Sequence, residues 1–177
     1  MLLLRWRPIR WCLQVAVRLF APRHRIGITA VVINAHSEIL LLHHVFHPTI
    51  PWGAPGGWLD AGEAPLHGAL RELQEETGII ATDATLIYMR REKLPDHLGI
   101  AYLIHLSESD TAPPESLTLS HEINTAKWFT AAELPRLTSF TREAIKIALE
   151  MIHSQKQPLF NTPTLTNKQT QNHPESS

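Results

Sequence analysis

Three glutamates, Glu72, Glu75 and Glu76, lie within five consecutive positions of the chain. On a helix they would share an arc of about 100°, where like charges repel by roughly 0.2–0.5 kcal/mol per pair. Divalent cations such as Mg²⁺ bind carboxylate oxygens and complete their shells with water and substrate phosphates. The spacing therefore predicts a metal–phosphate site, and the alternative is a solvated acidic face in which Arg71 pairs with Glu75 at i,i+4.

A glycine-rich stretch, PTIPWGAPGG at residues 48–57, lies shortly before these carboxylates. Because Gly56 and Gly57 have no Cβ, their backbone can approach a ligand closely. Bound cations would also remove the repulsion between the carboxylates. The segment therefore has the parts of a metal–phosphate site.

From Gly57 to Ile79 the chain reads Gly57, five residues, Glu63, seven residues, and then RELQEETGI. This pattern resembles the Nudix box, G-x5-E-x7-R-E-U-x-E-E-x-G-U, in which U is a bulky aliphatic residue, and every defined position is matched. A looser similarity extends over about residues 24–153, with PGG before the box and WF followed by ELP after it.

The resemblance implies an α/β fold, an α/β/α sandwich with a mixed sheet and the box as loop–helix–loop. It implies Mg²⁺- or Mn²⁺-dependent hydrolysis of a nucleoside diphosphate linked to another group X, with ADP-ribose, a nucleotide sugar or a nucleoside di- or triphosphate as candidate substrates. The metal ligands it implies are Gly57 through its carbonyl, Glu72, Glu75, Glu76 and the more distant Glu122. Glu72 is favoured as the general base with Glu122 second, while Arg71 holds a glutamate in place. Glu63 supports the loop or contacts metal-bound water.

Further side chains are candidates for contact with the substrate. Arg25 and Arg90 suit a distant phosphate or the X group, His47 lies on the loop side, and Trp52 flanks the glycines. Trp58 also flanks them, and core packing is the alternative for both tryptophans. In the run HHVFH at residues 43–47, neighbouring strand histidines point to opposite faces, so we expect only one of the pair to face the site.

Several elements must position these residues. The helix is expected to begin at Pro65 and to end at Gly78, with Leu66, Leu70, Leu73 and Thr77 buried and the glutamates pointing elsewhere. The other expected elements are a strand pair at 25–34 and 38–45, strands at 84–92, 98–107 and 126–130, a loop at 109–120, a helical turn at 131–134 and a helix at 139–154.

Composition limits the wider interpretation. The 177 residues suit one domain, predicted at 24–154, between a basic and apolar segment at 1–23 and a polar tail at 155–177 that is expected to be disordered. The first segment is expected to be amphipathic and to pack on the domain or on a partner subunit, with a membrane-surface helix as the alternative. Its arginines interrupt every apolar run, so no transmembrane segment is expected.

The net charge of −1 gives no general attraction for nucleic acid. The single Cys12 excludes an internal disulfide and a cysteine zinc site, and it fits the cytoplasmic location that we expect. A small nucleotide is the expected partner, and a homodimer is possible. Two other functions stay open, an RNA 5′-end pyrophosphohydrolase and a Nudix-fold nucleotide-binding module without turnover. The complete set of box glutamates disfavours the second.

Overall fold

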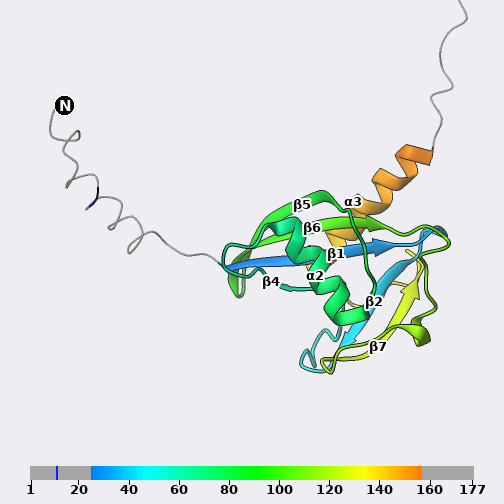
Figure 1. Cartoon of the computed structure of the whole chain (residues 1–177), viewed down its shortest axis with the longest axis horizontal. Coiled ribbons are helices and arrows are strands. Elements are labelled where there is room, and N and C mark those ends of the chain that lie inside the picture. Colours follow the sequence, from blue (N-terminus) through cyan, green and yellow to red (C-terminus); the bar gives the residue numbers. More distant parts are fainter. Residues whose placement is uncertain (1–10, 12–24, 157–177) are drawn as a thin grey trace, which may run out of the picture.

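The computed structural model describes residue 11 and residues 25–156. In this part of the chain, one mixed sheet lies between two helices (Figure 1). The predictions for the N-terminal segment and the polar tail fall almost entirely outside the described residues. The elements are β1 Arg25–Ile33, β2 Ile39–His44, β3 Trp52–Gly53, β4 Gly56–Trp58, α2 Pro65–Thr77, β5 Thr85–Lys93, β6 Asp96–His105, the 3-10 helix η2 Pro114–Ser116, β7 Ile123–Phe129 and α3 Ser139–Lys156.

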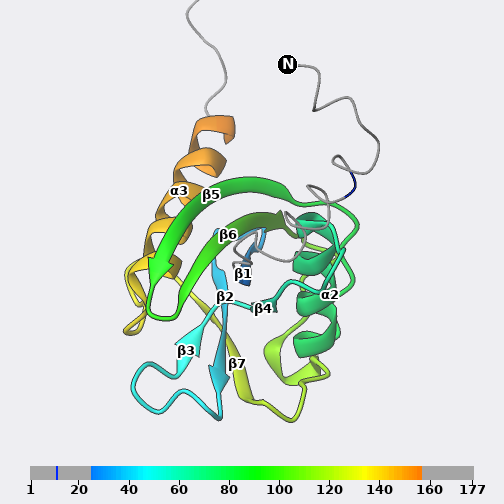
Figure 2. The ribbon, with the colours of Figure 1, turned by 90° about the vertical axis from the view of Figure 1, so that its left-hand side faces the viewer.

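The sheet order is β3-β2-β1-β6-β5, with β4 paired to β1 and β7 paired to β2. β1 and β6 run parallel over nine residue pairs, whereas the other pairings are antiparallel. Helices α2 and α3 cover opposite faces, as Figure 2 shows from the side. The predicted α/β/α sandwich with a mixed sheet is therefore confirmed.

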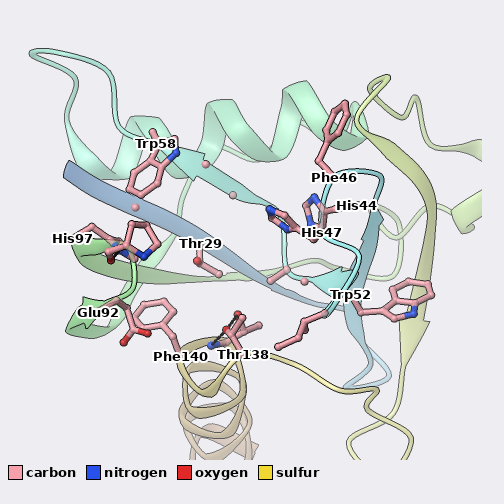
Figure 3. Close-up of a pocket in the computed structure, with 18 of the residues that line it drawn as sticks. Thr29, His44, Phe46, His47, Trp52, Trp58, Glu92, His97, Thr138 and Phe140 are labelled. Atoms are coloured by element: carbon pink, nitrogen blue, oxygen red, sulfur yellow. Dashed lines mark hydrogen bonds between the residues drawn. The ribbon is translucent and has the colours of Figure 1, made fainter.

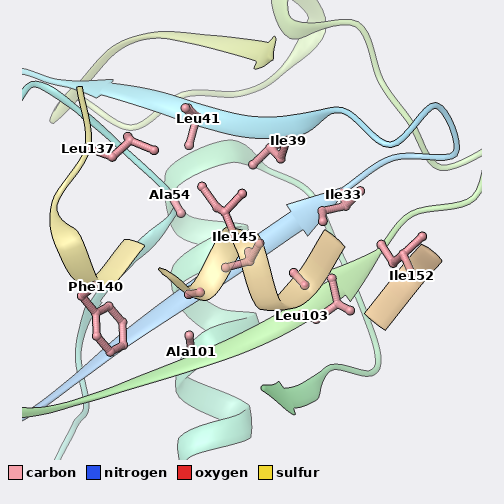
Figure 4. Packing of buried hydrophobic residues seen from close by; sticks show 13 residues of the cluster. Ile33, Ile39, Leu41, Ala54, Ala101, Leu103, Leu137, Phe140, Ile145 and Ile152 are labelled. Atoms are coloured by element: carbon pink, nitrogen blue, oxygen red, sulfur yellow. The ribbon is translucent and has the colours of Figure 1, made fainter. Parts of the chain in front are cut away.

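The core has two halves because alternate side chains of β1 point to opposite faces of the sheet. Val31 and Ile33 pack toward Ile145 of α3 (Figure 4). Ala30 and Val32 pack on the other face, in the cluster that contains Leu73 of α2. Burial of each large aliphatic side chain contributes about 1.5–3 kcal/mol. Both helices thus pack on the same strand, one on each face of the sheet, and this packing fixes their positions relative to the sheet.

Most of the expected elements are present, with four differences. The stretch at 48–57 contains the short strands β3 and β4, and the loop at 109–120 contains η2. β7 begins at Ile123, before the expected 126, because its pairing with β2 extends to His44. Residues 131–134 form a turn without a helix, closed by the Glu133 amide on the Thr130 carbonyl at 3.1 Å. Pro135 explains this, since the residue before a proline avoids the α conformation.

Candidate functional site

Helix α2 carries the carboxylates, and its two ends are fixed by local sequence. Pro65 occupies the first turn, where its missing N–H costs nothing. Gly78 ends the helix with φ of 75° and donates its N–H to the Gln74 carbonyl at 2.8 Å. The left-handed φ favours glycine there. Both predicted ends are confirmed.

The prediction that the three glutamates point away from the core together is wrong for Glu76. Its exposed fraction is 8%, and its Oε2 accepts a hydrogen bond from the Gly56 amide at 2.9 Å. The buried stripe of α2 includes Ala69, Leu73 and Glu76, at spacings of four and three residues, whereas Leu70 is only partly buried. Leu73 and Thr77 are fully buried as predicted, and the predicted stripe is wrong in leaving out Glu76, because β4 lies over the helix face that carries this residue.

Arg71 neutralises most of the remaining acidic charge. Its Nε donates to Glu63 at 2.9 Å, and its Nη1 donates to Glu72 at 2.9 Å and to Glu75 at 3.0 Å. Nη2 donates to the Trp58 carbonyl at 3.2 Å, which ties the helix to β4. The Arg71 hydrogen bond lowers the pKa of Glu63. The Arg71–Glu75 pair considered for a solvated acidic face is present, but it is one part of a network that reaches into the glycine loop.

Glu76 has a different environment. Burial raises its pKa to about 7, the Gly56 hydrogen bond opposes this, and the negative charges of Glu72, Glu122 and Glu75 add to it. Burial is also the main cause that raises the pKa of Glu72. Glu72 lies against Gly57, where an added Cβ would meet its carboxylate. Two largely buried carboxylates thus flank the Gly56–Gly57 backbone, and a cation bound there would neutralise their negative charge.

Glu122 precedes β7, and its side chain is 58% exposed. Its carbonyl accepts the Val45 amide at 2.9 Å, which fixes its backbone beside the end of β2. Its charge contributes to the raised pKa of Glu76, so the two carboxylates lie within electrostatic reach. No three histidine, cysteine, aspartate or glutamate side chains within the described residues form a group that by itself could hold a metal ion. Water and substrate oxygens would have to complete any metal shell, as is usual for Mg²⁺.

A pocket of about 630 Å³ lies on the α3 side of the sheet, between β4 and the start of α3 (Figure 3). Gly56 and Gly57 line it, so the backbone that touches Glu76 and Glu72 also borders the pocket. The polar side chains of its lining are Thr29, His44, His47, Thr49, Glu92, His97, Thr138 and Thr141. The pocket can therefore hold the groups attached to a phosphate that sits at β4.

The four predicted substrate residues are placed differently. His47 and Trp52 line the pocket, although the Trp52 ring also packs edge-on against Phe129 with centroids 5.1 Å apart. Arg25 is outside the lining and lies 5.6 Å from the centre of the Trp58 ring. Arg90 is also outside the lining, and its Nε donates to Glu92 at 2.6 Å.

Trp58, for which contact with the substrate and core packing were both considered, also lines the pocket, as do His44 and His97. Trp58 directly follows the glycine pair, which was the available signal, and its exposed fraction is 43%. His44, and not His43, lines the pocket, as strand alternation requires of one member of the pair. Burial lowers the pKa of His44 to about 4, so its ring is neutral near pH 7. For His97 the sequence held no signal, because the approach of β6 to β4 across β1 depends on the sheet order.

Known proteins resemble this chain in sequence and in fold. The model of the NUDIX domain matches residues 23–148. The chain belongs to the Nudix family. Phosphatase NudJ of Shigella boydii is 28% identical over 144 residues, which cover 76% of this chain and 91% of that protein. These matches place the chain among the Nudix hydrolases.

Solved structures show the same Nudix fold. The NUDIX domain of Shewanella oneidensis NrtR, crystallised with ADP ribose, has a TM-score of 0.66 and 20% identity, covering 83% of this chain and 99% of that one. An ADP-ribose pyrophosphatase from Streptococcus suis has a TM-score of 0.60 and 20% identity, covering 75% and 95%. In the described part of this Nudix chain, no helix combines the length and the apolar character needed to cross a membrane.

Proposed function

We propose that this Nudix hydrolase cleaves the pyrophosphate linkage of a small nucleoside diphosphate derivative, such as ADP-ribose or a nucleotide sugar, with Mg²⁺ or Mn²⁺. The observation that carries the proposal is the pair of largely buried carboxylates, Glu72 and Glu76, against a glycine backbone that also lines a large pocket. A cytoplasmic location and a possible homodimer remain parts of the proposal.

The carboxylate oxygens fit a hard divalent cation. Glu72, Glu75, Glu76 and the Gly57 carbonyl are the proposed ligands, with Glu122 as an additional one from the loop before β7. What a divalent cation supplies there is neutralisation of phosphate charge and a lower pKa for water. The raised pKa of Glu76 supports this assignment. A buried carboxylate without a counter-ion lowers the stability of the fold, and a bound cation offsets this loss.

The other residues have positioning or proton-transfer roles. Arg71 joins Glu63, Glu72 and Glu75, and through the Trp58 carbonyl it fixes this cluster to β4. We assign the general base to Glu72, which lies beside the glycine backbone where the phosphate would sit, and keep Glu122 as the second candidate. A carboxylate of raised pKa is well suited to accept a proton near neutral pH.

The proposal is tested by incubating the purified protein with a panel of nucleotide sugars, ADP-ribose, dinucleotides and triphosphates, with and without Mg²⁺ or Mn²⁺. Products are identified by mass spectrometry, and the reaction in ¹⁸O-water shows which phosphorus is attacked. We expect metal-dependent release of a nucleoside monophosphate. Absence of turnover on the whole panel, by folded protein with either ion, would contradict the proposal.

The matched variants are Glu76→Gln and Glu133→Gln. The first keeps the side-chain shape but removes a proposed ligand, so we expect activity to fall by orders of magnitude. Glu133 is exposed, accepts a hydrogen bond from the Thr130 hydroxyl at 2.8 Å and is not part of the pocket lining, so its variant should keep wild-type turnover. Equal losses in both would indicate a general effect of removing negative charge.

A further inference from the structure

Strand β5 leaves two large apolar side chains exposed on the α2 side of the sheet. Leu86 and Met89 have exposed fractions of 54% and 58%. Their partners on β6 are Tyr102 and Ile100, which belong to a buried cluster on the α2 side. Leu98, further along β6 on the same side, is only partly buried against that cluster. We call the surface formed by Leu86, Met89 and Leu98 the β5 face.

The position of α2 explains why the β5 face is exposed in the described part of the chain. β5 is the last strand in the sheet order, and α2 packs mainly on β1 and β4. On the other side of the sheet α3 covers β5, where the Tyr88 and Phe140 rings lie 5.3 Å apart. Neighbouring exposed apolar side chains on an edge strand mark a surface that another segment or molecule covers.

The chain enters the sheet beside the β5 face. β1 begins at Arg25, and Ile26 pairs with Leu98 on the α2 side. β5 lies two strands from β1, which is about 10 Å at about 4.8 Å per strand. Residues 21–24 span up to about 14 Å when extended. The residues that precede them are therefore within reach of the β5 face.

The sequence before β1 has an apolar stripe at helical spacing. Pro8 and Pro22 delimit a stretch in which a helix can form. At about 100° per residue, one arc of about 80° contains the four apolar residues Ile9, Leu13, Val17 and Phe20. Trp11 is described in a helical conformation with an exposed fraction of 67%, and it lies about 160° from the middle of that arc. A helix that buries the stripe leaves Trp11 in solvent, which agrees with this exposure.

Charge favours contact between this segment and the domain. Residues 1–24 contain five arginines and no aspartate or glutamate, so their formal charge is +5 with histidine neutral. Residues 25–156 contain 16 aspartates and glutamates and 10 lysines and arginines, so their formal charge is −6. Opposite charges steer the association, while burial of apolar surface stabilises it. Two copies of the negatively charged domain repel each other, so charge disfavours direct pairing of two β5 faces.

We propose that residues 1–24 dock on the β5 face of their own domain through the stripe of Ile9, Leu13, Val17 and Phe20. The sequence alone left three surfaces open for this segment, namely the domain, a partner subunit and a membrane. The exposed face, the short connection to β1 and the opposite charges select the first. The inference is independent of the proposed function, because the β5 face lies on the side of the sheet opposite the pocket.

Chemical cross-linking tests the contact in the full chain. Cys12 is the single cysteine and flanks the stripe, so Met89→Cys adds a second thiol on the β5 face. In dilute protein a short bismaleimide should link the two thiols within one chain, which mass spectrometry of the joined peptides identifies. Glu150→Cys is the matched control, because Glu150 is exposed on α3, across the sheet. A link in both variants, in neither, or only between two chains would overturn the proposal.

Proteolysis gives an independent measure of docking. Trypsin cleaves after Arg18, and a docked segment should be protected relative to a synthetic peptide of residues 8–25. Leu13→Gln and Met89→Gln each remove an apolar contact, so we expect cleavage after Arg18 to be about 10-fold faster in either variant. The double variant should be no faster than the faster single variant, because the same contact is lost in both. Trp11→Gln, outside the stripe, should keep the wild-type rate.

Two results would assign a different occupant and overturn the proposal. Wild-type cleavage as fast as that of the peptide, with binding of the protein to vesicles of phosphatidylcholine and phosphatidylserine, would place the segment on a membrane surface. A dimer in analytical ultracentrifugation that Met89→Gln dissociates would show that a second copy covers the β5 face. Slow wild-type cleavage together with a cross-link within one chain supports docking.

Discussion

Replacement of Glu76 by glutamine should stabilise the metal-free protein while it abolishes activity. Glu76 is 8% exposed, and its Oε2 accepts a hydrogen bond from the Gly56 amide at 2.9 Å. Glutamine can accept the same bond through its amide oxygen. The substitution therefore keeps the local contacts and removes a buried negative charge, which is costly in the absence of a cation.

The size of the effect follows from the pKa. Burial raises the pKa of Glu76 from 4.5 to about 7. The folded state binds the proton of Glu76 more tightly than the unfolded state does. Protonated Glu76 therefore makes its full contribution to stability below pH 4.5, and this contribution is lost as the pH rises through 7. At pH 8.5 ionised Glu76 destabilises the metal-free fold by up to about 3 kcal/mol, at about 1.4 kcal/mol for each pKa unit. For a chain of this length, 1 kcal/mol changes the melting temperature by about 2–4 °C.

The assay is thermal unfolding in EDTA at pH 8.5, followed by circular dichroism, for wild type and Glu76→Gln. The melting temperature of the wild type alone, measured against pH, would not isolate Glu76, because the effect of His44 on stability has the opposite pH dependence. Burial lowers the pKa of His44 from 6.5 to about 4, so its contribution is present above pH 6.5 and is lost as the pH falls toward 4. The difference between variant and wild type at each pH removes the His44 contribution.

Glu75→Gln is the matched control, because the Glu75 side chain is 59% exposed and its charge is paired with Arg71. We expect its melting temperature in EDTA to change by about 2 °C or less. Added Mg²⁺ should raise the melting temperature of wild type by more than that of Glu76→Gln. An unchanged or lower melting temperature of Glu76→Gln at pH 8.5 in EDTA would refute the reasoning that a buried, uncompensated charge is present.

Four other substitutions give expected outcomes. Leu73→Ala should lower the free energy of unfolding in urea by about 2–5 kcal/mol and Leu70→Ala by less, since Leu73 is fully buried and Leu70 is not; equal losses would contradict the observed stripe. Arg71→Lys should cost about 1–3 kcal/mol by the same measurement, because the three N–H donors of a lysine cannot replace the bonds of the planar guanidinium to three carboxylates and the Trp58 carbonyl, and a loss below about 0.5 kcal/mol would mean that the network contributes little. Gly57→Ala should lower kcat at least about 10-fold because the added Cβ meets the Glu72 carboxylate, and wild-type kcat would show that this contact does not matter.

The sequence alone determined the features that depend on local chemistry and on fixed spacing. The box residues from Gly57 to Ile79 predicted the family, and Pro65 and Gly78 predicted the ends of α2 because proline and glycine act on their own backbone. Runs of aliphatic and β-branched residues predicted the long strands for a similar reason, since alternation along a strand is a local property.

The tertiary structure decided which side chains meet across the sheet. Glu76 is buried because β4 crosses the face of α2 that carries it, and residue type could not show that a carboxylate would take a core position. Trp58 and His97 are 39 positions apart in the sequence, and their rings meet because β1 runs between β4 and β6. Arg25 and Arg90 could not be assigned in advance, because a cation binds a phosphate or a ring according to which of them the fold places within reach.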